Sequence, residues 1–158
     1  MSKKRQSKEF LVRQANARAD FMRITELDAR LFPGAPLSAI CIRQYLDLFS
    51  SLSFVGQLDD DTNIAAYSIT GISNTGIAWL LSVCTAPELR RLGVGEMIIE
   101  RTVEKLIENE ISEYCLTVSP ENTAARRLFE KSGFCECGCE ESYFGAGEDR
   151  VIMRRVLR

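Results

Sequence analysis

The chain has 158 residues, 46% of them hydrophobic, and a formal net charge of −2. A chain of this length buries roughly 68–70% of its unfolded surface when it folds as one compact domain, which gives it enough core to stand alone. No stretch approaches the ~20 apolar residues of a membrane-spanning helix, and the N-terminus has no apolar signal core. We therefore expect a cytoplasmic protein without membrane contact.

Charge is distributed unevenly along the chain. Residues 1–8 carry four bases and no acid, whereas residues 136–149 carry five acids and no base. We interpret residues 1–9 as a flexible basic arm ahead of a single domain over residues 10–158. Such an arm can contact nucleic acid, but a solvated tail that aids solubility is the commoner role. A nucleic-acid partner is therefore not expected.

The first half of the chain predicts three strands and two helices. Phe32-Pro33-Gly34 separates the two helices, because proline and glycine stop the first one. An acidic turn over residues 59–63 joins the second and third strands as a hairpin. The predicted strands are residues 10–15, 53–58 and 64–72, and the predicted helices are residues 20–31 and 37–49.

The next strand, residues 77–85, leads into a glycine turn. Its apolar residues alternate (Ile77, Trp79, Leu81, Val83 and Thr85), and the sequence Pro87, then Arg90-x-x-Gly93-x-Gly95, follows. The two glycines let the backbone approach a ligand, so the free N–H groups of the following helix point at one small volume. With the helix dipole and the guanidinium groups of Arg90 and Arg91, they form an anion site. This site suits the pyrophosphate of a phosphorylated cofactor.

Two common phosphate motifs do not fit this turn. A P-loop places Lys-Ser or Lys-Thr after its glycines, and neither pair follows here. A dinucleotide fingerprint needs a third glycine at the position that Ile98 occupies. We therefore expect neither a nucleoside triphosphate nor a dinucleotide.

A second block follows the helix that begins after Gly95. A strand over residues 116–118 precedes Asn122-Thr-Ala-Ala125-Arg-Arg-Leu128-Phe129-Glu-Lys-Ser-Gly133-Phe134. We predict a helix with Ser119 as its N-cap, Pro120 at its first position and Gly133 at its end. Residues 135–144 and 150–157 are predicted to form the closing strands.

Three of the six cysteines lie in the first of these closing strands. Cys135, Cys137 and Cys139 alternate, so they are expected to share one face. A zinc site would need a fourth ligand, and the chain contains no histidine. We therefore expect no metal, three half-buried thiols and a reducing compartment.

The two motif blocks lie in order and about 25 residues apart, and together they resemble the motifs of the GNAT acetyltransferases. That family has Gln/Arg-x-x-Gly-x-Gly after a strand and a proline, then Asn-x-x-Ala-x-x-Leu-Tyr-Glu-Lys-x-Gly-Phe. Within the family, the chain looks most similar to ribosomal-protein alanine N-acetyltransferases. The resemblance implies an α/β (α+β) fold over roughly residues 10–157, with a mixed central sheet of about seven strands flanked by four helices.

The resemblance also implies acetyl-CoA as the acetyl donor and CoA as a product. In related enzymes the backbone of the cofactor strand pairs with the pantetheine arm, and the glycine turn holds the phosphates. Asn122 carries over as a cofactor contact that can also cap its helix, and Phe129 lies where a residue faces the cofactor sulfur. The remaining implied cofactor residues are Val83, Cys84, Thr85, Arg90, Arg91, Leu92, Gly93, Val94, Gly95 and Glu96.

Two departures from the family pattern affect catalysis. The tyrosine that protonates the departing thiolate in many members is Phe129 here. The glutamate that takes the amine proton in ribosomal-protein alanine N-acetyltransferases is replaced by Thr117. Both usual proton-handling side chains are therefore absent, and the resemblance assigns no catalytic residue.

Other residues are candidates for the missing roles. Tyr143 is expected at the end of strand 135–144, where related N-terminal acetyltransferases place aromatic residues beside the peptide. It is our candidate acid, or it lines the substrate groove. Phe32 and Pro33 border the substrate entrance or simply separate two helices. Cys84 is either an acetylated nucleophile or a buried strand cysteine whose backbone touches the cofactor.

We predict an acetyl-CoA-dependent N-acetyltransferase that acts on a primary amine. An α-amine of pKa about 7.7–8.0 is roughly one-third neutral near pH 7.5, whereas lysine is neutral only at the ~0.1% level. Lack of the usual base therefore favours a protein N-terminus or a small amine of low pKa. The alternative is a non-catalytic acyl-CoA-binding module or sensor, which Phe129 and Thr117 favour. A monomer and a homodimer both remain open.

Overall fold

The computed structural model describes residues 9–58 and 63–158. Residues 1–8 of the predicted arm (residues 1–9) and residues 59–62 of the predicted acidic turn lie outside this part. The strands are β1 (Phe10–Gln14), β2 (Phe54–Leu58), β3 (Ile64–Ile72), β4 (Ala78–Thr85), β5 (Glu113–Val118), β6 (Cys135–Glu140) and β7 (Arg150–Val156). The α-helices are α1 (Phe21–Leu31), α2 (Ala39–Phe49), α3 (Val94–Glu108) and α4 (Thr123–Lys131), and two short 3-10 turns are η1 (Ser50–Leu52) and η2 (Pro87–Leu89).

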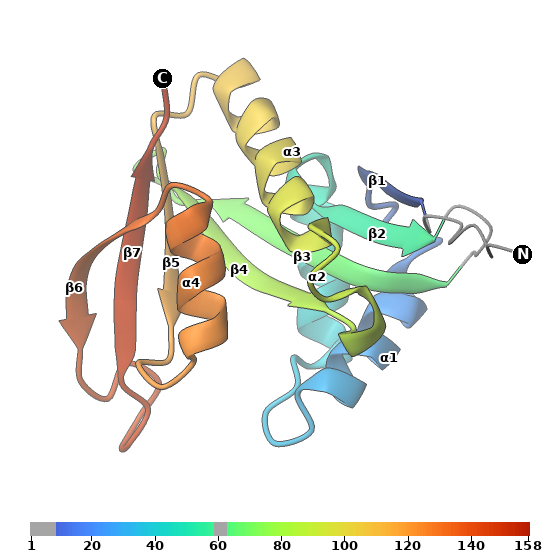
Figure 1. The fold of residues 1–158 in the computed structure, drawn as a ribbon. Coiled ribbons are helices and arrows are strands. Elements are labelled where there is room, and N and C mark those ends of the chain that lie inside the picture. Colours follow the sequence, from blue (N-terminus) through green and yellow to red (C-terminus); the bar gives the residue numbers. More distant parts are fainter. Residues whose placement is uncertain (1–8, 59–62) are drawn as a thin grey trace, which may run out of the picture.

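All seven strands belong to one sheet in the order β1-β2-β3-β4-β5-β7-β6. Every neighbouring pair is antiparallel except β4 and β5, which are parallel. Helices α3 and α4 lie in front of the sheet in Figure 1, and α1 and α2 lie behind it. The mixed seven-stranded sheet with four helices confirms the predicted fold class. None of the helices in the described residues is long and apolar enough to cross a membrane.

Each face of the sheet has its own apolar core. Behind it, Ile24 and Leu27 of α1 and Ile42 and Leu46 of α2 pack with Tyr67 of β3. In front, the apolar stripe of α3 and Phe129 of α4 cover β4, β5 and β7. Burying one apolar stripe per helix on both faces is the usual solution for a layered α/β domain.

A β-bulge changes which side chains of β4 face each core. Ile69 of β3 pairs with Ser82 and Thr70 pairs with Leu80, so Leu81 is the extra residue. Leu80 therefore faces α3, while Ser82 and Cys84 face α1 and α2. The predicted alternation of Ile77, Trp79, Leu81, Val83 and Thr85 was wrong, because the buried residues of β4 are Ala78, Leu80 and Cys84 instead.

Two predicted element ends were also wrong. Helix α4 begins at Thr123 with Asn122 as its N-cap, rather than with Ser119 and Pro120. The Asn122 side chain accepts a hydrogen bond from the Ala125 N–H at 3.1 Å, which satisfies a free donor of the first turn. Strand β6 ends at Glu140, so Tyr143 lies in the turn that follows it.

The predicted cysteine face does not form. A register shift between Glu136 and Gly138 interrupts the pairing of β6 with β7. Cys135 then pairs opposite Arg154 and Cys139 opposite Val151, three positions apart, so these two side chains lie on opposite faces. All three thiols are exposed rather than half-buried, and the described residues contain no cluster suited to a metal ion.

Candidate active site

The central feature of the site is the separation of β4 from β5. Their parallel pairing covers only Ala78–Leu80 against Tyr114–Leu116, although β4 continues to Thr85 and β5 to Val118. Beyond Leu80 the strands diverge (Figure 1), directly after the bulge at Leu81. The backbone of β4 from Ser82 to Thr85 therefore presents an edge on the β5 side, to which an extended ligand with amide groups can pair.

The glycine turn lies at the end of β4. Gly93 is the N-cap of α3 with φ 81° and ψ 9°, in the left-handed region that glycine adopts without strain, and Arg91 also has a positive φ of 64°. The first intrahelical bond of α3 runs from the Met97 N–H to the Gly93 carbonyl at 3.0 Å. Gly93 supplies no side-chain cap, so the first N–H groups of this helix are available to an anion.

A cavity of about 630 Å³ connects these two features. It lies between β4, the glycine turn and α4, and the end of α1 closes one side. The predicted residues that line it are Phe32, Val83, Cys84, Thr85, Arg90, Arg91, Gly93, Val94, Gly95, Glu96, Asn122 and Phe129. Leu92, Pro33 and Tyr143 are not among the lining residues. Leu92 is largely exposed, and the Tyr143 ring packs against that of Phe144 at 4.8 Å between centroids.

Sequence reasoning missed seven lining residues: Leu31, Leu89, Ala124, Ala125, Arg127, Leu128 and Lys131. Most of them belong to α4, within the second motif. Helical spacing was a signal only for Ala125, which lies three positions after Asn122 and four before Phe129.

The cavity wall carries an excess of positive charge. Arg90, Arg91, Arg127 and Lys131 contribute four cations and Glu96 one carboxylate. Lys131 Nζ lies 2.8 Å from Glu96 Oε1, which ties α4 to the first turn of α3 across the cavity. Arg90 Nε donates to the Thr85 carbonyl at 3.2 Å, which holds that guanidinium beside the end of β4. This surplus suits a ligand with several phosphates.

The inner end of the cavity is apolar. Phe129 is buried and packs edge-on against Phe134, with 6.0 Å between ring centroids. Burial, and to a smaller extent the charge of Asp28, raises the pKa of the Cys84 thiol to about 12. A thiol with such a pKa is almost entirely protonated at neutral pH, which argues against Cys84 as a nucleophile and favours its structural role.

A chain of polar side chains lies behind β4, on the α1 side, and sequence reasoning missed it. The Tyr67 hydroxyl donates to Asp28 Oδ1 of α1 and lies 2.7 Å from Ser82 Oγ of β4. The other carboxylate oxygen of Asp28 accepts the Leu37 N–H at 2.6 Å. Burial, with the neighbouring Cys84 and Asp28, raises the pKa of the Tyr67 phenol well above its ordinary value. Asp28 and Tyr67 are fully buried, whereas Ser82 is partly exposed.

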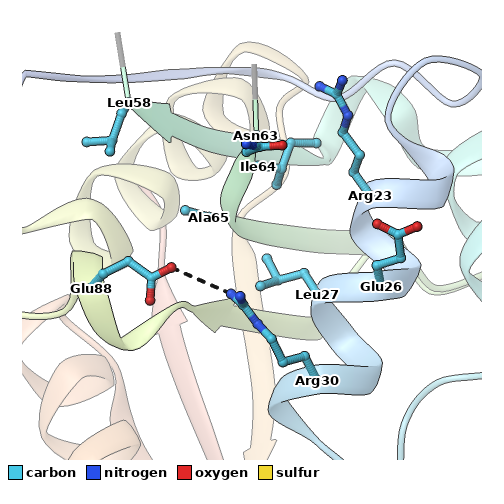
Figure 2. A pocket seen from close by; sticks show the side chains of 9 residues that line it. All are labelled: Arg23, Glu26, Leu27, Arg30, Leu58, Asn63, Ile64, Ala65 and Glu88. Atoms are coloured by element: carbon cyan, nitrogen blue, oxygen red, sulfur yellow. Dashed lines mark ion pairs between the residues drawn. The ribbon is translucent and has the colours of Figure 1, made fainter. Parts of the chain in front are cut away.

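A second hollow, of about 400 Å³, lies beside the first and is shown in Figure 2. Helix α1 borders it on one side and the β2–β3 hairpin on the other. Arg30 and Glu88 point toward one another with 3.7 Å between nitrogen and oxygen, but both are well exposed. No motif residue lines this hollow, and its two arginines and two glutamates balance, so it lacks the positive surplus of the first cavity.

Known proteins share the sequence pattern and the fold. The model of the acetyltransferase (GNAT) family matches residues 20–134. A ribosomal protein bS18-alanine N-acetyltransferase of Salmonella typhimurium is 30% identical over 100 residues, covering 61% of this chain and 67% of the relative.

Solved structures show the same fold. The Escherichia coli ribosomal-protein-S18-alanine N-acetyltransferase superposes with a TM-score of 0.79 at 22% identity, over 94% of both chains. A Salmonella typhimurium protein solved with its cofactor acetyl-CoA gives a TM-score of 0.79 at 17% identity, again over 94% of both chains. The chain belongs to the GNAT family of acetyltransferases, and its acetyl donor is acetyl-CoA.

Proposed function

We propose that this acetyltransferase modifies the α-amino group of a protein or peptide N-terminus. The observation that carries the proposal is the pair of substitutions beside the β4–β5 opening, where Phe129 and Thr117 stand at the positions of the usual acid and base. An acceptor with a substantial neutral fraction at physiological pH depends least on a strong base, and an α-amine meets that condition far better than lysine. The name of the Salmonella relative, which acts on an alanine of a ribosomal protein, supports the same acceptor class.

Different groups around the cavity bind different parts of acetyl-CoA. The free backbone of Val83, Cys84 and Thr85 pairs with the pantetheine arm as an added strand. The N–H groups at the start of α3, together with Arg91 and Arg127, hold the phosphates. Acetyl-CoA supplies the thioester, and Phe129 gives its sulfur an apolar environment at the inner end of the cavity.

The acceptor approaches from the α1 side of β4. Phe32 lies at the end of α1 and lines the cavity mouth, and it forms the entrance with Pro33. Tyr143, in the turn after β6, lines the groove farther out. Relatives named for a ribosomal-protein substrate and three exposed thiols on β6 both fit a cytoplasmic location.

Two measurements test the function. Calorimetry with acetyl-CoA and CoA establishes binding, and release of free CoA thiol in the presence of an amine establishes transfer. The acceptor panel contains peptides with a free N-terminus and blocked lysines, the reverse peptides, and polyamines. Transfer to the free N-terminus, located by mass spectrometry, is the expected result. Binding without thiol release on any amine would favour the acyl-CoA sensor instead.

A further inference from the structure

In the hydrogen bonds behind β4, each hydroxyl donates toward Asp28: Ser82 to Tyr67, and Tyr67 to Asp28. The Tyr67 hydroxyl donates its proton to Asp28 Oδ1, a carboxylate oxygen that acts as the acceptor. The single phenolic proton is then used, and the contact of 2.7 Å between Tyr67 and Ser82 requires Ser82 to donate. The Ser82 proton therefore points inward, and its oxygen keeps only lone pairs for a further partner. That oxygen is suited to accept an N–H group.

Ser82 lies on β4 at the start of the opening, next to the approach proposed for the acceptor amine. It directly follows the bulge at Leu81, at the point where β4 leaves β5. Its side chain faces the α1 side together with Cys84; Cys84 lines the cavity, whereas Ser82 is not among the lining residues. Unlike Asp28 and Tyr67, Ser82 is partly exposed. The chain of three groups thus connects a buried carboxylate to a partly exposed hydroxyl two positions before Cys84.

We propose that Ser82 binds the incoming amine as a hydrogen-bond acceptor and takes its proton, with Tyr67 and Asp28 positioned to relay that proton inward. The proposal rests on the proposed function, because it assigns the base of the same transfer. As the amine nitrogen bonds to the thioester carbonyl carbon, the C–S bond breaks and the electron pair stays on sulfur. The amine proton moves to Ser82 Oγ, the Ser82 proton to Tyr67 Oη and the Tyr67 proton to the Asp28 carboxylate. The proton shifts among Asp28, Tyr67 and Ser82 then reverse, and the proton that came from the amine leaves Ser82 Oγ and reaches the CoA thiolate through solvent.

The surroundings of the three groups favour a relay over a free phenolate. The titratable groups that face Asp28 are Tyr67 from β3 and Cys84 from β4, while Arg30 of α1 acts on Cys84. Because its pKa is raised, Tyr67 keeps a proton throughout and passes one on while receiving another. Asp28 also accepts the Leu37 N–H just before α2, so a purely structural role for the network predicts a lower melting temperature with kcat unchanged in the folded variant.

The test compares Ser82→Ala and Tyr67→Phe with two matched controls. Ser68→Ala removes a hydroxyl of β3 that is buried without a hydrogen-bond partner in the described residues. Tyr114→Phe removes a buried phenol that lies 2.7 Å from Thr70 Oγ1, away from Asp28. For each protein, kcat/KM on a peptide with a free N-terminus and blocked lysines is measured from pH 6 to pH 9, together with the melting temperature and the Kd of acetyl-CoA.

We expect Ser82→Ala and Tyr67→Phe to lower kcat/KM at pH 7 by at least about tenfold, at the modest end of general-base effects. The loss should persist at every pH from 6 to 9, because the wild-type rate also follows the neutral amine, and it should appear in kcat while the Kd of acetyl-CoA changes by less than threefold. The controls should keep wild-type kinetics. If the wild-type protein transfers acetyl groups and Ser82→Ala does so with the same kcat/KM, the relay is wrong but the proposed function stands. This conclusion does not depend on whether Tyr67→Phe folds. A wild-type protein that acetylates no amine overturns the proposed function and the relay with it.

Discussion

A comparison of Gly93→Asp with Gly93→Asn isolates the effect of one negative charge at the proposed phosphate site. Gly93 is the N-cap of α3 in the left-handed region, where a Cβ would meet no atom within 4 Å. Asparagine and aspartate tolerate that conformation better than other residues, and both are good N-caps. The variants Gly93→Asn and Gly93→Asp therefore share a shape and a capping group, and they differ by one negative charge.

The expected effect follows from Coulomb's law. A carboxylate about 6 Å from one phosphate charge costs ~0.7 kcal/mol in bulk water and ~2.8 kcal/mol at an effective dielectric constant of 20. Two phosphate charges double these values, so Gly93→Asp should weaken acetyl-CoA binding by at least about tenfold relative to Gly93→Asn. Calorimetry at low ionic strength gives the two Kd values, and added salt should narrow the difference. The melting temperature without ligand should not fall in the aspartate variant, because its charge favours the N-terminus of α3. Equal Kd values for the two variants would refute the phosphate site.

Three further predictions concern other parts of the chain. Phe129→Tyr places a hydroxyl at the inner end of the cavity, so turnover should rise or its pH profile should shift while the Kd of acetyl-CoA stays within a few-fold; wild-type kinetics at every pH would mean that this ring does not face the sulfur. Cys84→Ala should keep acetyl transfer within a few-fold, because a thiol of pKa about 12 is not a nucleophile at neutral pH, and a loss of more than about 10²-fold would restore the acyl-enzyme alternative. Asp20→Asn should lower stability by about 1.5–3 kcal/mol, since Arg13 donates to this carboxylate at 2.7 and 2.9 Å. Burial opposes ionisation there, but the bonds from Arg13 and the Asn16 N–H outweigh it and hold the pKa of Asp20 below its ordinary value. The contribution is therefore present above pH ~3.9 and is lost as the pH falls through the lower folded-state pKa, which acid denaturation of the two proteins would reveal.

Local signals predicted the elements that depend on nearby residues. The turn at Gly93 was recognisable because a left-handed N-cap needs glycine, and the spacing to Arg90 and Gly95 places it after a strand. The start of α4 was misassigned because Ser119-Pro120 and Asn122 both carry cap signals. The contact of Asn122 with the Ala125 N–H decides between them, and it is visible only in three dimensions.

Features that depend on distant partners escaped prediction. The bulge at Leu81 and the register shift in β6 arise from pairing with β3 and β7, and a single strand gives no sign of either. The relay was missed for the same reason, since Asp28 and Tyr67 lie 39 residues apart. In the sequence Asp28 is one acid among several in an amphipathic helix, and only the fold shows that it is buried.

A competition between two matched peptides tests the acceptor most directly. One peptide has a free N-terminus and a blocked lysine, and the other has a blocked N-terminus and a free lysine. From the neutral fractions alone, the α-amine should be acetylated on the order of 10²-fold faster at pH 7, although the greater nucleophilicity of lysine reduces the ratio. Between about pH 7 and 9, lysine transfer should rise close to tenfold per unit while α-amine transfer levels off near its own pKa. Equal rates at neutral pH, or a faster reaction at lysine, would contradict the assignment of this protein as an N-terminal acetyltransferase.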